Sequence, residues 1–306
     1  MSILQVIVLA IVQGLAELLP VSSSAHVVVA EKLMGLDPTT PEMTLLLVML
    51  HTGTMFAVIA YFWRRWAKTY FRSAAAFQSI ALRIVAATVL TAVVGYPIIK
   101  VIEKVMFKGA DKAEIEQLFG RLDLVAAALF CAGVLILIAG LAERRNLMPS
   151  RAQDRTLDKN RGRSSGTELL TLRQSSLIGA VQGLCLPFRG FSRSGATIST
   201  GMLAGVARDT AETFSFALAV VLTPAVIGRE ALRLVKASHE AVASGSPIDL
   251  RASVVVSLLG AFFSFVAGLV ALKWLSSWLE AGRWYLFGIY CLVAAGVVFF
   301  LHLRGY

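Results

Sequence analysis

The sequence predicts an all-α protein that crosses a membrane several times, with about six transmembrane helices and two re-entrant helical hairpins in inverted-topology repeats. Three observations support this fold class. Hydrophobic residues make up 57% of the 306 residues and charged residues only 16%, with a mean hydropathy of +0.73. Apolar windows recur at a length of about 20 residues, which suits a helix across the hydrocarbon core of a bilayer. Two segments that each contain Gln-Gly-Leu are apolar but broken by Pro, Gly and Ser, as half-length helices are.

Six windows are candidates for the spanning helices. Five of them carry almost no charge and lie close to the ~20 residues that a spanning helix requires. They cover 44–63, 77–99, 122–142, 252–272 and 284–303. The sixth, 213–235, contains Pro224 and ends among Arg229, Glu230 and Arg233. We expect its last turn to reach an interface or to line a cavity.

Two further segments, 3–35 and 174–207, break near their middle, which leaves helical pieces of about ten residues and predicts re-entrant hairpins. One hairpin followed by three spans then occurs twice, at 1–142 and at 174–306, with residues 143–173 as a basic linker. Because three crossings are an odd number, we expect the second repeat to enter the bilayer upside down. The two hairpins would then meet near the midplane.

The basic residues lie in short loops beside the apolar windows, which is typical of membrane orientation rather than of nucleic-acid binding. Loop 64–72 carries four basic residues and no acidic one, and 143–173 carries eight basic against four acidic residues. Both are expected in the cytoplasm, and the balanced segments 100–121 and 236–251 are expected outside, together with both termini. The net charge of +10 therefore predicts a membrane and no nucleic acid as partner. The sequence leaves a homodimer open.

The break in the second hairpin is polar. It reads Ser192-Arg193-Ser194-Gly195-Ala196-Thr197 and precedes a helical stretch rich in small residues. Polar side chains at bilayer depth are costly unless they face one another or a wet cavity, so such a cluster marks a site. Backbone N–H groups, hydroxyls and one guanidinium converge here where a helix begins, which predicts an anion site. Arginine favours phosphate, because its planar fork binds two oxygens at once.

The break in the first hairpin carries complementary chemistry. It reads Leu19-Pro20-Val21-Ser22-Ser23-Ser24-Ala25-His26, and His26 can act as a base or nucleophile near neutral pH. Glu17 lies four residues after Gln13 on the same helical face, where it could orient His26, hold a divalent ion or handle protons. Phosphoryl transfer requires such a set: a cationic clamp, a nucleophile and a proton acceptor.

Structural roles compete with these interpretations. Serine and glycine in membrane helices commonly allow close packing, at roughly even odds for any single serine here. Gln13 and Gln182 can hold the hairpins together without a catalytic duty. His51 and His302 are expected to be satisfied or interfacial side chains rather than catalysts. The three cysteines match neither a disulfide framework nor a zinc site, so we expect them in the core.

At these motifs the chain resembles the bacterial undecaprenyl pyrophosphate phosphatases, also known as bacitracin-resistance proteins. The resemblance covers most of the chain. It implies an enzyme of the bacterial cytoplasmic membrane that hydrolyses undecaprenyl pyrophosphate to the monophosphate and inorganic phosphate, with a pocket open to the outer face. That activity recycles the lipid carrier for cell-wall synthesis and confers bacitracin resistance. The motifs are Gln13-x-x-x-Glu17, the Leu19–His26 segment, Phe62-Trp63-Arg64-Arg65, the segment from Gly190 to Thr197, and Phe214-Ser215-Phe216.

The resemblance also implies roles for single residues. Arg193 and the loop amides would clamp the pyrophosphate while Ser23, assisted by His26, attacks the terminal phosphorus; in an equally economical version His26 activates water. Glu17 would orient His26 or bind Mg²⁺ or Ca²⁺. The implied catalytic residues are Glu17, Ser23, His26 and Arg193. The implied substrate-binding residues are Gln13, Ser22, Ser24, Arg189, Gly190, Ser192, Ser194 and Thr197.

The chain departs from the family pattern at two site positions. Arg189 precedes Gly190 where the family has proline, which predicts a different loop geometry and a second cationic contact to the pyrophosphate. Gln13 replaces a glutamate, which weakens the case for a metal held by two carboxylates. The linker 143–173 is also long for the family.

Other function classes are open to the same residues. Paired hairpins at the midplane are a transporter architecture, so the alternative is a prenyl-phosphate flippase that uses the pocket for binding only. Release of phosphate by the purified protein would discriminate the two. The type 2 phosphatidic acid phosphatases are disfavoured, since no Arg-Pro pair occurs and Ser199, not histidine, stands six residues after Arg193.

Overall fold

The fold is a bundle of helices, seen here in a computed structural model that describes residues 1–37, 40–106, 121–157, 170–243, 250–279 and 283–305. Within these ranges all regular structure is helical, which confirms the predicted fold class. The helices in chain order are α1 (Ile3–Leu18), α2 (Ser23–Leu33), α3 (Pro41–Thr69), α4 (Ala74–Met106), α5 (Leu122–Leu157), α6 (Leu172–Cys185), α7 (Arg193–Leu203), α8 (Arg208–Ala243), α9 (Leu250–Leu279) and α10 (Trp284–Leu303).

The two predicted hairpins are the short pairs α1–α2 and α6–α7. Helices α2 and α7 have 11 residues each, so at ~1.5 Å per residue they reach only about half of a hydrocarbon core. One backbone N–H group in the first turn of each is capped by a serine hydroxyl: Ser22 accepts from Ala25 N, and Ser192 accepts from Gly195 N. Each hairpin therefore turns inside the bundle with a capped helix N-terminus at its break.

Five of the described helices are long and apolar enough to cross a membrane: α3, α4, α5, α9 and α10. These are the five clean windows of the sequence. The sixth window lies in α8, which runs for 36 residues with Pro224 inside it and does not meet the same criterion of length and apolarity. Helix α5 continues through residues 143–157, which the sequence places in the linker, and 158–169 fall outside the described residues.

Small residues set the distances between the long helices. A Cβ added to Gly53 of α3 would lie 2.1 Å from the backbone oxygen of Ala261 in α9. Added to Gly179 of α6, it would lie 2.2 Å from the oxygen of Ala87 in α4. Without a hydrophobic force between helices in lipid, such close backbone approach supplies much of the packing energy.

Several helix pairs at corresponding positions of the two predicted repeats make corresponding contacts, and others do not. Helix α1 packs along α9 as α6 packs along α4, and α5 pairs with its counterpart α10. Among the pairs that differ, α3 packs closely on α9 whereas α4 and α8 barely touch. One side of the bundle is therefore closed and the related side is open.

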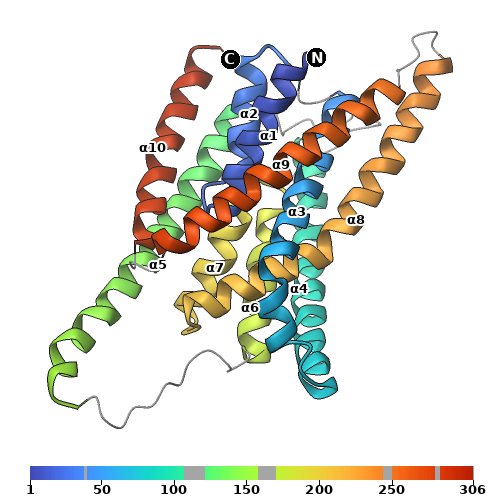
Figure 1. The fold of residues 1–306 in the computed structure, drawn as a ribbon. Coiled ribbons are helices and arrows are strands. Elements are labelled where there is room, and N and C mark those ends of the chain that lie inside the picture. The colour runs from blue at the N-terminus through green and yellow to red at the C-terminus, as the bar shows by residue number, and fades with distance from the viewer. Residues whose placement is uncertain (38–39, 107–120, 158–169, 244–249, 280–282, 306) are drawn as a thin grey trace.

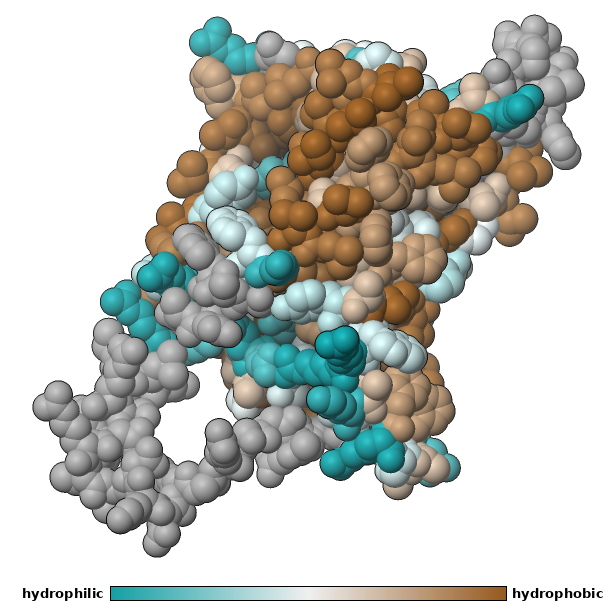
Figure 2. Space-filling view, viewed as in Figure 1, coloured by the Kyte–Doolittle hydropathy of each residue, from teal (hydrophilic) through white to brown (hydrophobic). Residues whose placement is uncertain are grey.

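Both termini lie at one end of the bundle, and the turn between α3 and α4 lies at the opposite end (Figure 1). Apolar side chains cover much of the face shown in Figure 2, with hydrophilic residues toward both ends. This is the surface expected of a protein embedded in lipid.

Candidate active site

The breaks of the two hairpins meet at one cavity of about 500 Å³. The first turns of α2 and α7 both line it, through Ser22–Ser24 and Ser192–Ser194. Two helix N-termini thus bring backbone N–H groups and positive dipole ends to the same space, which favours an anion. The remaining wall comes from the end of α1, α3, Ile99 of α4, the end of α6 with the loop that follows it, and α8.

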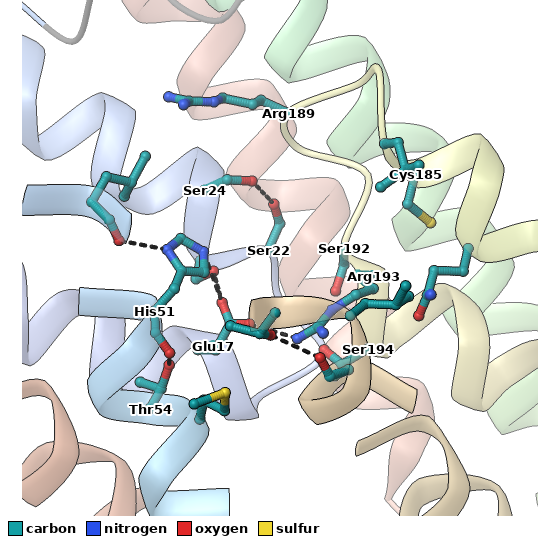
Figure 3. A pocket seen from close by; sticks show the side chains of 18 of the residues that line it. Glu17, Ser22, Ser24, His51, Thr54, Cys185, Arg189, Ser192, Arg193 and Ser194 are labelled. Atoms are coloured by element: carbon teal, nitrogen blue, oxygen red, sulfur yellow. Dashed lines mark hydrogen bonds and ion pairs between the residues drawn. The ribbon is translucent and has the colours of Figure 1, made fainter. Parts of the chain in front are cut away.

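Glu17, on the last turn of α1, is the centre of the polar contacts in this cavity (Figure 3). Its Oε2 accepts a 3.0 Å hydrogen bond from Nε2 of Gln13, one turn earlier, and a short bond from the Ser23 hydroxyl. Its Oε1 accepts from Nη2 of Arg193 at 2.6 Å. The predicted meeting of Glu17 and Arg193 across the two repeats is therefore present, and the nearest hydroxyl is that of Ser23.

The loop before α7 is tied to the first hairpin. Ser194 Oγ donates to the backbone oxygen of Leu19 at 3.3 Å, and Gly190 N donates to Ser24 Oγ at 3.4 Å. Gly190 has φ 107°, and a Cβ there would lie 2.4 Å from the oxygen of Val125 in α5. Only glycine fits this left-handed, closely packed position, so the loop geometry depends on it.

His26 lies away from this cluster. Its Nδ1 is 2.7 Å from the backbone oxygen of Ser22, and its Nε2 is 2.6 Å from the hydroxyl of Tyr290 in α10. His26 does not line the cavity, and no hydrogen bond within the described residues joins it to Glu17 or Ser23. The expectation that Glu17 orients His26 is thus not met, because both ring nitrogens of His26 are engaged by the Ser22 carbonyl and the Tyr290 hydroxyl instead.

His51 takes the place beside Glu17 that the sequence analysis gives to His26. Its Nε2 lies 3.5 Å from Glu17 Oε2, and its Nδ1 bonds the oxygen of Leu47 at 2.8 Å. The sequence analysis treats His51 as an interfacial residue because it stands alone in an apolar helix. The signal that it missed is that an ionisable residue within a spanning segment commonly faces the interior site.

The other predicted ligands divide into two groups. Arg189, Ser22, Ser24, Ser192 and Ser194 line the cavity. The second group does not line the cavity and lies behind the residues that do; it comprises Gln13, Gly190 and Thr197. Thr197 is fully buried and bonds Arg193 O at 2.7 Å and Ser215 Oγ at 2.5 Å, which fixes α7 against α8.

The residues present do not fit a divalent ion held by the protein alone. Glu17 is the one acidic residue among those that line the cavity, and both of its oxygens accept hydrogen bonds from side chains. Within the described part of the chain, no three His, Cys, Asp or Glu side chains form a group that could hold a metal. Mg²⁺ sites in phosphoryl-transfer enzymes use one or two carboxylates together with substrate phosphates.

Comparison with known proteins decides the family. The model of the family described as "Bacitracin resistance protein BacA" matches residues 6–297. The chain belongs to this family. It is 53% identical over 298 residues, 97% of each chain, to undecaprenyl-diphosphatase 2 of Acinetobacter baylyi. It is 32% identical to the undecaprenyl-diphosphatase of Rhodopirellula baltica, with 99% of each chain covered. The undecaprenyl-diphosphatase of Korarchaeum cryptofilum is 30% identical, with 96% of this chain covered.

The BacA match confirms the resemblance on which the sequence analysis relied. It extends over both hairpins and all the long helices. The fold brings Glu17 and Ser23 of the first hairpin together with Arg193 of the second in one carboxylate-centred cluster.

Proposed function

We propose that this protein hydrolyses undecaprenyl diphosphate to undecaprenyl phosphate and inorganic phosphate, and that the cavity between the two hairpins is its active site. The activity is that of the BacA relatives, which align over nearly the whole chain. It assigns the protein to recycling of the lipid carrier for cell-wall synthesis and to bacitracin resistance. The observation that carries the assignment to this cavity is the hydrogen-bonded set of Ser23, Glu17 and Arg193.

The set supports a nucleophilic mechanism. The Ser23 hydroxyl already donates to Glu17, so this carboxylate can accept the proton as the serine oxygen attacks the terminal phosphorus. The bond from that phosphorus to the bridging oxygen breaks, and undecaprenyl phosphate leaves. The proton that Glu17 took leaves with undecaprenyl phosphate, so Glu17 can accept a proton from the water that then attacks the phosphoserine. The bond from phosphorus to the Ser23 oxygen breaks, Glu17 returns this proton to Ser23, and inorganic phosphate is released. In this scheme Glu17 takes the role of base that the sequence analysis gives to His26.

Positive charge stabilises the phosphates during both steps. Arg193 lies on the cavity with 31% of its side chain exposed, so its guanidinium can reach a phosphate as well as Glu17. The N-termini of α2 and α7 add backbone N–H donors and dipoles. Arg189 lines another part of the cavity (Figure 3), and we propose that it contacts the second phosphate.

The prenyl chain reaches the bilayer through the open side between α4 and α8. Apolar side chains from these two helices, among them Ile99, Leu222 and Ile227, line the cavity there. The related side between α3 and α9 is closed by the contact of Gly53 with Ala261. A long apolar chain can therefore stay in lipid while its diphosphate lies between the hairpins.

The cavity opens toward the outer face of the membrane. The helix ends that line it, the start of α3 at Thr44 and the end of α4 at Ile99, belong to the same end of the bundle as the two termini. The opposite end carries loop 64–72 with its four basic residues, which favours the cytoplasm.

Phosphate release by detergent-purified protein with undecaprenyl diphosphate tests the function. Wild-type protein should release phosphate, and Glu17→Gln, which keeps the shape of the side chain but not its charge or basicity, should lower kcat by about 10³-fold or more. A flippase would move lipid without releasing phosphate, and none of the comparisons favours it. A chelator in the same assay tests the Mg²⁺ or Ca²⁺ of the sequence analysis, which we propose is bound mainly by diphosphate oxygens.

The purified protein also allows its predicted partners to be tested. The lipid is the partner that the site chemistry requires, and the absence of a nucleic-acid partner stays a prediction from the charge pattern of the sequence. Light scattering of the same preparation tests the homodimer that the sequence leaves open.

A further inference from the structure

The turn that presents the Ser23 nucleophile is held in an unfavourable backbone conformation. Ser22 has φ 67° and ψ 88°, and it is the one residue other than glycine with positive φ in the described part of the chain. A left-handed serine persists only where its surroundings hold it, and such residues gather at active sites. What holds Ser22 therefore also decides where the adjacent Ser23 hydroxyl lies.

His26 holds the peptide of Ser22. The carbonyl oxygen of Ser22 accepts the main-chain N–H of His26 at 3.4 Å and contacts Nδ1 of the same residue at 2.7 Å. The side-chain contact is thus the shorter of the two. Because a carbonyl oxygen only accepts, Nδ1 carries the proton in this arrangement.

Tyr290 in turn holds His26. Its hydroxyl is 2.6 Å from Nε2, and the two rings stack with an interplanar angle of 10° and centroids 5.7 Å apart. The Ser22 carbonyl thus selects the tautomer with the proton on Nδ1, and Nε2 then accepts a hydrogen bond from the tyrosine hydroxyl. This second hydrogen bond fixes the orientation of the ring that bonds Ser22.

We propose that Tyr290, acting through His26 and the Ser22 carbonyl, is a positioning residue for the Ser23 nucleophile. The path runs from α10 of the second repeat to the α1–α2 turn of the first, and neither ring lines the cavity. A displacement of about 1 Å at a nucleophile lowers rates by about 10²-fold, so an interaction outside the cavity can control the chemical step. The proposal rests on the proposed function, since it takes Ser23 as the nucleophile.

A purely structural role makes a different prediction. If the pair only satisfies two polar groups near the lipid-facing surface of α10, its loss should lower stability and leave turnover per folded molecule unchanged. If it positions Ser23, its loss should lower kcat while substrate binding through Arg193 is kept.

The test is Tyr290→Phe, which keeps the stacked ring and removes only the hydroxyl. We expect kcat with undecaprenyl diphosphate to fall about 10-fold, with KM and the Kd of a non-hydrolysable methylene analogue within about twofold of wild type. Tyr61→Phe is the matched control, since Tyr61 is also partly exposed on a spanning helix and far from the hairpin turns in the chain. It should retain wild-type kcat, and both variants should have wild-type melting temperatures.

A double-mutant cycle with His26→Phe separates the relay from independent effects. In the His26→Phe background, Tyr290→Phe should lower kcat no further, because the bond to Ser22 is already absent. Wild-type kcat for Tyr290→Phe, a rise in KM alone, or multiplicative effects in the cycle would each overturn the proposal. Ser23→Ala distinguishes failure of this proposal from failure of the proposed active site. If Ser23→Ala is inactive while Tyr290→Phe has wild-type kcat, only the positioning role of Tyr290 is wrong.

Discussion

At the scale of residues, one carboxylate organises the site. The side chain of Glu17 is 13% exposed, and it is contacted by Gln13, Ser23, Arg193 and His51. A carboxylate so surrounded is stabilised in its charged form by its donors and cations, and it stays next to the Ser23 hydroxyl, which donates to it. Its position explains why both hairpins are needed, since two of its partners come from the first hairpin and Arg193 comes from the second.

The first prediction concerns Ser23→Ala. If Ser23 is the nucleophile, the variant should lose nearly all hydrolysis while binding undecaprenyl diphosphate with unchanged Kd, because only the attacking oxygen is removed. Phosphate release and equilibrium lipid binding measure the two quantities. If water attacks instead, the loss should not exceed one hydrogen bond, on the order of 1 kcal/mol or a few-fold in rate. A variant that keeps a third of wild-type activity would contradict the serine mechanism.

The second prediction concerns Arg193→Lys, which keeps the charge and removes the planar fork. We expect kcat/KM to fall by about 10²-fold, on the order of 2.7 kcal/mol, because a lysine cannot contact Glu17 and two phosphate oxygens in the same way. Steady-state phosphate release is the measurement. Arg173→Lys is the control, because this exposed arginine is in the first turn of α6 and does not line the cavity. Near wild-type turnover by Arg193→Lys would remove Arg193 from the site.

At the scale of elements, short helices and close helix contacts position the chemistry. Helices α2 and α7 end too soon to span, so their N-termini lie inside the bundle rather than in solvent. The long helices then differ in how they close around them: α3 contacts α9 backbone to backbone at Gly53, whereas α4 stays apart from α8. The open side is the path that we propose for the prenyl chain of the substrate.

The third prediction tests that path with Ile99→Trp, which narrows the opening between α4 and α8. We expect kcat/KM for undecaprenyl diphosphate to fall about 10-fold, because the protein would lose roughly 1.4 kcal/mol of binding free energy for the long prenyl chain. The fall in kcat/KM for geranyl diphosphate, which has a short chain, should be smaller. Val93→Trp is the matched control, because Val93 lies on the same helix with 60% exposure and does not line the cavity. Equal losses for both substrates, or no loss for either, would show that the prenyl chain leaves the cavity elsewhere.

At the scale of the whole molecule, two ion pairs join the start of α8, in the second repeat, to α3 and α5, which begin in the first repeat. Asp209 is paired with Arg65 at the end of α3, and Arg208 lies 3.1 Å from Glu143 of α5. These contacts lie at the end of the bundle opposite the termini, where the α3–α4 turn lies. Ion pairs thus join the helices at that end, whereas the cavity lies toward the other end. This arrangement agrees with access of the substrate to the site from one end of the bundle.

The fourth prediction concerns this sidedness. In a background without native cysteines, Arg304→Cys near the C-terminus should react with a membrane-impermeant maleimide in intact cells, and Ser73→Cys in the α3–α4 turn only after permeabilisation. Labelling is read by gel shift, and both positions are exposed. Phosphate release by each variant shows that it is folded. The reverse labelling pattern would place the cavity mouth on the cytoplasmic side.

The sequence by itself determined the fold class, the five clean spans, the two broken hairpins and the family. Each of these depends on local composition: apolar length decides whether a helix can span, and Pro, Gly and Ser decide where it breaks. The motifs also named Glu17, Ser23 and Arg193, since polar groups in apolar sequence are informative wherever they occur.

Only the tertiary structure decided which imidazole meets Glu17. His26 is three residues from Ser23 and shares its motif, yet its ring bonds Tyr290, whereas His51 comes from a separate helix. Likewise, residues 143–157 contain few apolar side chains but continue α5 as helix. The direction in which a side chain points from its helix, and the contacts between helices distant in sequence, depend on packing. The partner of His26 is more than 200 residues away, so the spacing of residues within the motif cannot predict it.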